Sequence, residues 1–91
     1  MNDYSLIKSV LSGIYSSSVG YDEAEAINEL QKDCKENEIF RKEFLQEITE
    51  AFSDSKISWK HLLADYDVVF FDEEDTARKY AKKILLDVIK S

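Results

Sequence analysis

The residues of this sequence with the most obvious chemistry are carboxylates gathered around aromatic side chains. The stretch from Ala64 to Asp75, ADYDVVFFDEED, surrounds four consecutive apolar residues with six acids and contains no Lys or Arg. If part of the apolar run is exposed, the stretch is an anionic rim around an apolar anchor. Interfaces with basic partners use this combination, because charge speeds encounter and buried aromatic side chains supply much of the affinity. The alternative is that all the apolar residues belong to the core and the acids only solvate it.

The acids of this stretch fall into two groups. Those from Asp72 to Asp75 stand where a helix is expected to begin, and carboxylates there gain about 0.3–1 kcal/mol each from the helix dipole. The spacing also predicts ion pairs from Glu74 to Arg78 and from Asp75 to Lys79. Asp65, Tyr66 and Asp67 precede the apolar run and have a weaker structural explanation, so these three are the sharper candidates for recognition.

A second acidic cluster surrounds the expected start of another helix, where capping and a solvated face are the alternative explanation. The exposure of Phe70 or Phe71 decides whether the first region is a binding site. We therefore take as candidate partner-binding residues Asp65, Tyr66, Asp67, Phe71, Asp72, Glu73, Glu74 and Asp75 in the first region, and Asp22, Glu23, Glu25 and Glu29 in the second.

Catalysis and cofactor binding find little support in the sequence. His61 is the only histidine, and Cys34 falls at the apolar spacing of an expected helix, as a small core residue would. Two separated glycines cannot build a phosphate-binding loop. Asp65-x-Asp67 starts like a calcium-binding EF-hand loop, but Phe70 stands where that loop needs glycine. We expect no catalytic residue, no cofactor and no metal site, and hence a protein that is not an enzyme.

Charge and composition restrict the partners and the compartment. Nineteen acids against twelve bases give a net charge of −7, which repels phosphate backbones and attracts cationic surfaces. A single cysteine excludes an internal disulfide. The N-terminus lacks the features of a signal peptide, and no apolar run approaches the roughly 20 residues of a membrane span. We expect a cytoplasmic protein that binds neither nucleic acid directly nor membranes, although such a charge also serves solubility alone.

The elements that position these residues are expected to be helices. The 91 residues include no proline and two glycines, too few for the many turns of an all-β domain. Helical spacing of apolar residues predicts an all-α single domain, a compact bundle of four to five helices with short loops. The expected segments are about 3–18, one from Asp22 to about Asn37, one from Asn37 to about 52, a short one after Ser58, and a last one over about 73–90.

Local signals mark the helix ends and the inward faces. Gly20 can take a positive φ after the first segment, and Asp22 with Glu25 forms a capping-box pattern. Asn37 and Ser58 are the expected caps of the next two helices. Because no Gly or Pro separates the two segments around Asn37, one continuous helix is the alternative there. The inward residues of the second helix are expected to be Ala24, Ile27, Leu30 and Cys34, and those of the last helix Ala77, Tyr80, Ala81, Ile84, Leu85, Val88 and Ile89.

Three segments of the chain together resemble a known class of proteins. They are FRKEFLQEI from Phe40, SWKHLLADYDV from Ser58, and ARKYA from Ala77 after an acidic turn. This pattern, over roughly residues 38–83, resembles small helical bacterial immunity proteins of contact-dependent growth inhibition and related toxin systems. The resemblance implies a non-enzymatic inhibitor that binds a cognate toxin domain in the cytosol. Many such toxins are nucleases, whose basic surface an acidic inhibitor occupies as a phosphate mimic.

Two other functions stay open from the sequence. A small acidic regulatory protein that mimics nucleic acid toward a DNA-binding protein would use the same surface. A carrier protein would need a phosphopantetheine serine, and Asp54-Ser55 is the nearest match, with Lys56 in the place of the usual Leu. Intact mass after expression with a phosphopantetheinyl transferase tests the carrier alternative.

Overall fold

Residues 4–90, which the computed structural model of the protein describes, form an all-α bundle, as the sequence predicts. Some long helices are divided by π-helical turns, so that α1 continues into η1, and α5 continues through η3 into α6. The segments are α1 (Ser5–Val10), η1 (Leu11–Tyr15), η2 (Ser17–Val19), α2 (Glu23–Glu36), α3 (Glu38–Ser53), α4 (Trp59–Asp65), α5 (Glu74–Ala81), η3 (Lys82–Leu86) and α6 (Asp87–Lys90). The expected start of the first helix at residue 3 lies outside the described residues.

The helix ends follow the caps expected from the sequence. Asp22 accepts a hydrogen bond from the Glu25 amide, and Glu25 completes the capping box. The Asn37 side chain accepts from the Phe40 amide, so α2 and α3 are separate helices. Ser58 caps α4 through the His61 amide at 3.2 Å, and Gly20 has φ 91°. Local chemistry thus determined these boundaries.

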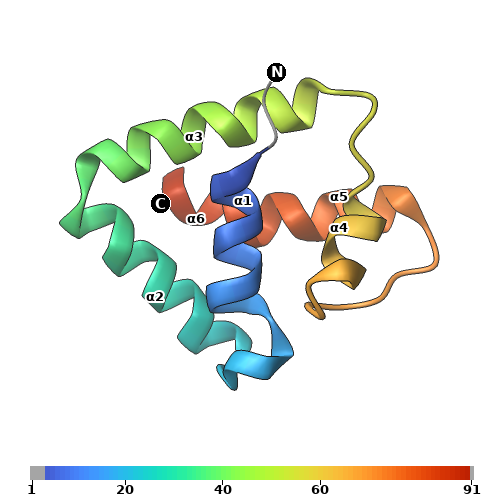
Figure 1. Cartoon of the computed structure of the whole chain (residues 1–91), viewed down its shortest axis with the longest axis horizontal. Helices are drawn as coiled ribbons and strands as arrows, with labels where there is room; N and C mark the ends of the chain where they lie inside the picture. Colours follow the sequence, from blue (N-terminus) through green and yellow to red (C-terminus); the bar gives the residue numbers. More distant parts are fainter. Residues whose placement is uncertain (1–3, 91) are drawn as a thin grey trace.

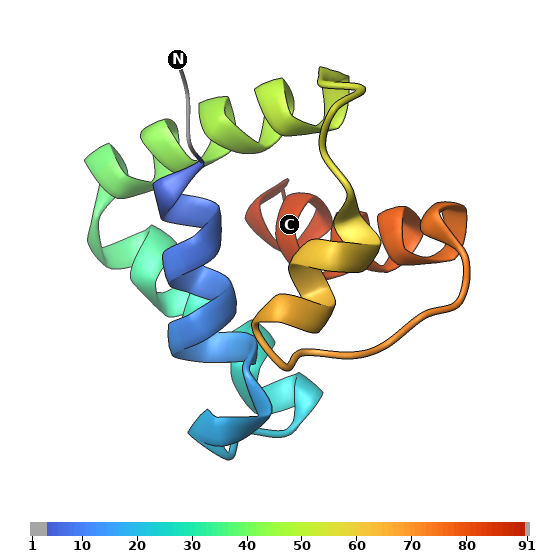
Figure 2. The same ribbon diagram turned by 45° about the vertical axis from the view of Figure 1, so that its right-hand side comes forward.

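The last helix runs through the middle of the bundle, with α1 crossing it and α3, α2 and α4 arranged around it (Figures 1 and 2). Ala77, Ala81, Ile84 and Leu85 are fully buried in it. The two alanines lie on the part against which α4 packs, and small side chains allow close approach there. Tyr80, expected inward, is half-buried.

One expected inward residue is wrong. Ala24 is exposed, whereas Ala26, Leu30 and Cys34 form the buried face of α2 and Ile27 is half-buried. The buried residues of α2 recur every four positions from Ala26, and Ala24, two positions before Ala26, lies on the other side of the helix. Among the described helices, none is long and apolar enough to cross a membrane.

A buried tyrosine ties the two π-helical turns together. The Tyr15 hydroxyl, at the end of η1, donates a hydrogen bond of 2.5 Å to the Ile84 carbonyl oxygen in η3. Burial raises the pKa of Tyr15 well above its usual range, so the hydroxyl stays protonated and available as a donor. The bond fixes the first helix against the last one.

Replacing Tyr15 by phenylalanine is expected to destabilise the fold by about 1 kcal/mol, because a buried hydrogen bond is lost while the ring is kept. The urea midpoint measures the effect. Tyr21→Phe is the control, since the Tyr21 ring is 41% exposed, and its midpoint should stay within error. Equal midpoints for Tyr15→Phe and the wild type would show that the bond contributes nothing.

Candidate partner-binding surface

The apolar run between α4 and α5 is divided by exposure. Val68, Val69 and Phe71 are half-buried and pack against the core. Phe70 is 73% exposed, the highest value among the exposed large hydrophobic residues of the described chain. Of the two phenylalanines whose exposure the sequence left open, Phe70 is therefore the one free for contact, and Phe71, which stands among the candidate partner-binding residues, is not. We call residues 66–73 the acidic loop.

Phe71 is used inside the molecule. Its ring lies 5.5 Å from the ring of Tyr80, at an angle of 58°, which is a favourable tilted geometry for two aromatic rings. This contact attaches the acidic loop to α5. Four apolar residues in sequence have neither the period of a helix nor that of a strand, so no sequence signal distinguished Phe70 from Phe71.

Asp67 has an unusual backbone conformation at the end of α4. Its φ is 55°, in the left-handed region where glycine is the default. The Val68 amide donates to the Leu63 carbonyl at 2.9 Å and the Asp67 amide to the Ala64 carbonyl at 3.1 Å. These two bonds make a Schellman motif with Asp67 in the position that glycine usually occupies.

The left-handed conformation of Asp67 costs conformational energy, and the dipole of α4 adds an electrostatic cost. Asp65 is the last residue of α4 and Asp67 lies two positions beyond it, so both carboxylates face the negative end of the helix. Each such charge is unfavourable by a few tenths of a kcal/mol when exposed, and both residues are exposed. Asp65 and Asp67 therefore reduce local stability, which a purely structural role does not explain. Tyr66, the C-cap residue between them, is half-buried against the core.

Asp67→Gly is expected to stabilise the protein by about 1 kcal/mol, because it removes both the left-handed strain and the misplaced charge. Asp67→Asn keeps a residue that tolerates the left-handed region and should give a smaller gain. Thermal and urea midpoints measure both. A lower midpoint for Asp67→Gly would mean that the carboxylate makes a stabilising contact in solution.

The carboxylate of Glu74, a candidate binding residue, is used in hydrogen bonds within the protein. Its carboxylate accepts hydrogen bonds from the Ser58 hydroxyl at 2.6 Å, the Trp59 amide at 2.7 Å and the Lys60 amide at 3.3 Å. It therefore caps α4 from the first turn of α5. The predicted pairing with Arg78 is replaced, since the Arg78 guanidinium donates to the Phe52 carbonyl.

The other acids at the start of α5 are exposed. Asp75 forms the predicted ion pair with Lys79, at 3.4 Å. Lys60 donates from its ammonium group to the Asp72 backbone carbonyl at 3.2 Å, and Asp72 is exposed. The Glu73 side chain makes no capping hydrogen bond. Asp72 and Glu73 are therefore available to a partner.

The acids of α2 are also partly engaged. Asp22 and Glu25 form the capping box, and the Glu23 carboxylate lies 2.7 Å from the Lys83 ammonium. This pairing raises the pKa of Lys83 through the hydrogen bond to Glu23. Among the four candidates of this region, Glu29 is half-buried, whereas Asp22, Glu23 and Glu25 are exposed.

The fold brings the two acidic regions together. The Ser17 amide, at the start of η2, which precedes α2 in the chain, donates to the Asp67 carbonyl at 2.9 Å, and the two segments lie side by side in both views (Figures 1 and 2). Between them is a pocket of about 170 Å³ whose lining includes Tyr15, Tyr21, Asp22, Glu23, Val68 and Tyr80. We call it the tyrosine pocket. The acidic loop and the start of α2 thus belong to one surface, a proximity that the sequence pattern does not contain.

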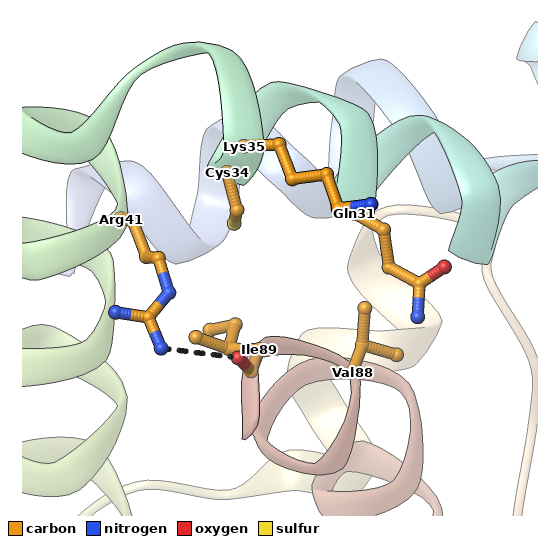
Figure 3. Close-up of a pocket in the computed structure, with 6 residues that line it drawn as sticks. All are labelled: Gln31, Cys34, Lys35, Arg41, Val88 and Ile89. Carbon is orange, nitrogen blue, oxygen red and sulfur yellow. Dashed lines mark hydrogen bonds between the residues drawn. The ribbon is translucent and has the colours of Figure 1, made fainter. Parts of the chain in front are cut away.

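A second pocket lies between α2, α3 and α6 and has about 320 Å³. Cys34 points into it from α2, opposite Val88 and Ile89 of α6 (Figure 3). Burial raises the pKa of the Cys34 thiol, which disfavours a nucleophilic thiolate. Arg41 donates to the Ile89 carbonyl at 3.4 Å across one side. This pocket is a packing gap between helices, and Cys34 is the small core residue that its spacing predicts.

In comparisons with known proteins, no family model matches the chain, and no curated protein and no solved structure matches it significantly.

Proposed function

We propose that this protein is an immunity protein, which binds and neutralises a basic toxin domain in the cytoplasm. Because an acidic inhibitor fits the basic surface that holds nucleic acid, the proposed toxin is a nuclease. The observation that carries the proposal is Phe70, 73% exposed in a loop bordered by outward-facing carboxylates. A ring that is this exposed buries little of its area in the fold, and it can be buried in a pocket of a partner. Acids around it favour encounter with a cationic surface such as the one that holds nucleic acid.

The local cost of Asp65 and Asp67 supports the same proposal. Both acids oppose the dipole of α4, and Asp67 also occupies a left-handed conformation. Strain of this kind concentrates at binding and catalytic sites. Asp67 lies in the acidic loop and Asp65 directly precedes it, so that a partner docked on Phe70 would meet both carboxylates.

We expect a toxin reading frame immediately upstream of this protein's gene, and the neutralising activity is tested with the product of that reading frame. Co-expression should restore the growth of cells that carry the toxin, and the purified proteins should form a complex whose affinity falls as salt rises. A complex that forms with no salt dependence would contradict the electrostatic part of the proposal. Binding to a DNA-binding regulator and not to a toxin would favour the alternative of a nucleic-acid mimic.

Neutralising three acids should weaken that complex. The triple variant Asp65→Asn, Asp67→Asn and Asp72→Asn is expected to bind about tenfold or more weakly and with a smaller salt dependence. Asparagine at position 67 keeps the left-handed turn. The matched control is Glu36→Gln, Glu38→Gln and Glu43→Gln, three exposed acids at the end of α2 and in the first half of α3. The α2–α3 corner lies on the opposite side of the molecule from the acidic loop (Figure 1). If both triple variants lost the same affinity for the toxin, the effect would come from net charge alone, and the proposed site would be wrong.

A further inference from the structure

The tyrosine pocket combines aromatic walls with carboxylates. Tyr15, Tyr21 and Tyr80 line it together with Asp22 and Glu23. Aromatic faces attract cations through the ring quadrupole, and carboxylates beside them add direct charge attraction. With about 170 Å³, the pocket is smaller than the roughly 300 Å³ at which ordinary small-molecule sites begin, so it has room for a single side chain.

One of the molecule's own cations already contacts two residues that line this pocket, from an adjoining hollow that Lys83 lines together with Asp22 and Glu23. The Lys83 ammonium lies 5.8 Å from the centre of the Tyr80 ring and 2.7 Å from the Glu23 carboxylate. The same ring and the same acid therefore hold a positively charged group in the free protein. Both partners of this ion pair are exposed, Lys83 by 59% and Glu23 by 43% of their side chains, and an exposed pair contributes little and exchanges easily.

The balance of charge favours a second cation. The N-terminus of α2 carries about half a positive charge, but Asp22, Glu23 and Glu25 place three carboxylates around it. Asp22 uses one oxygen for the Glu25 amide at 2.8 Å. Glu23 uses Oε1 for Lys83. The second oxygen of each carboxylate remains a hydrogen-bond acceptor for an incoming group.

We propose that the tyrosine pocket receives the guanidinium group of an arginine of the basic partner, which displaces Lys83 from Glu23. Arginine suits the site better than lysine, because its planar group stacks on an aromatic ring while it donates to a carboxylate. This inference rests on the proposed function and adds a specific contact to it. The contact of Phe71 with Tyr80 connects the tyrosine pocket to the acidic loop. The partner's arginine in the tyrosine pocket and the partner's apolar pocket over Phe70 would therefore belong to one interface.

The test is a titration of the ¹⁵N-labelled full chain with N-acetylarginine methylamide, followed by amide chemical shifts. Saturable shifts should be concentrated at Tyr21, Asp22, Glu23, Val68 and Tyr80. N-acetylglutamine methylamide, which lacks the charge, should cause none of them, and the lysine analogue should bind more weakly. Shifts distributed over all acidic segments alike would overturn the pocket assignment.

Substitutions can distinguish arginine binding in the tyrosine pocket from attraction to the net charge of the protein. Lys83→Gln should tighten arginine binding about threefold or more, because Glu23 becomes free. Lys79→Gln makes the same charge change on the same long helix but pairs with Asp75 outside the pocket, and it should leave the affinity nearly unchanged. Tyr21→Leu, at a 41% exposed side chain, should weaken binding about threefold while the fold is kept. Equal effects of the two lysine variants, or none of Tyr21→Leu, would contradict the proposal.

Failure here is distinguishable from failure of the proposed function. If arginine does not enter the pocket but the toxin complex still depends on the acids and on Phe70, only the pocket assignment is lost. If the toxin is bound with no dependence on these residues, or is not bound, the proposed function is wrong even if the free arginine analogue binds.

Discussion

Replacing Phe70 by alanine is expected to weaken the complex with the toxin domain by roughly 30-fold or more, the largest effect of any single substitution on binding. Aromatic side chains that enter a pocket of the partner contribute about 2–4 kcal/mol when truncated, and 1.4 kcal/mol corresponds to a factor of ten. Because Phe70 is 73% exposed, the substitution should leave the urea midpoint of the free protein almost unchanged. Calorimetric titration of the toxin domain with each variant measures the affinity.

Ile39 provides a matched control for Phe70. It is 71% exposed and lies at the start of α3, on the opposite side of the molecule from the acidic loop (Figure 1). Ile39→Ala removes a similar exposed apolar side chain and should change the affinity by less than twofold. A complex that loses affinity with Ile39→Ala and not with Phe70→Ala would move the interface to the α2–α3 corner.

Replacing Glu74 by alanine is expected to destabilise the protein by about 2 kcal/mol, the largest effect among the acids from Asp65 to Asp75. The change removes the acceptor for the Ser58 hydroxyl and for the amides of Trp59 and Lys60. Loss of a cap alone costs about 0.5–2 kcal/mol, and hydrogen bonds to a charged group contribute more than neutral ones. Trp59 begins α4 and is buried, so the loss should also loosen the helix that carries Asp65.

Two substitutions test this role of Glu74 as a cap. Glu74→Gln keeps one acceptor oxygen and should lose about half as much stability as Glu74→Ala. Glu73→Ala changes the neighbouring acid, whose side chain makes no capping bond, and should lose less than half as much. Chemical denaturation measures all three. If Glu73→Ala and Glu74→Ala had the same midpoint, the effect would come from charge at the start of α5 and not from the bonds to α4.

The role of Glu74 as a cap of α4 could not be predicted from the sequence. The position of Glu74 at the start of a helix predicted a favourable dipole interaction and a pair with Arg78. In the structure its carboxylate crosses to a different helix, because α4 packs against α5 and leaves unpaired amides within reach. An i, i+4 rule covers one helix surface and contains no information about a neighbour that is 14–16 residues away in the chain.

The sequence by itself determined what depends on neighbouring residues. Asp22 with Glu25, Asn37, Ser58 and Gly20 specify helix ends through bonds or φ angles confined to a few positions. The 3.6-residue period specifies which side of each long helix is apolar. These signals were sufficient for the all-α bundle and for most of its core, including Cys34 and the last helix.

Only the tertiary structure decided which residues of the acidic regions are available. Phe70 and Phe71 are identical in type and adjacent, and the place of Tyr80 in the fold determines which ring is covered. The hydrogen bond from Ser17 to Asp67 joins segments 50 residues apart and so unites two acidic clusters that are separate in the sequence. Exposure and proximity result from the packing of distant segments, which local propensity and periodicity do not encode.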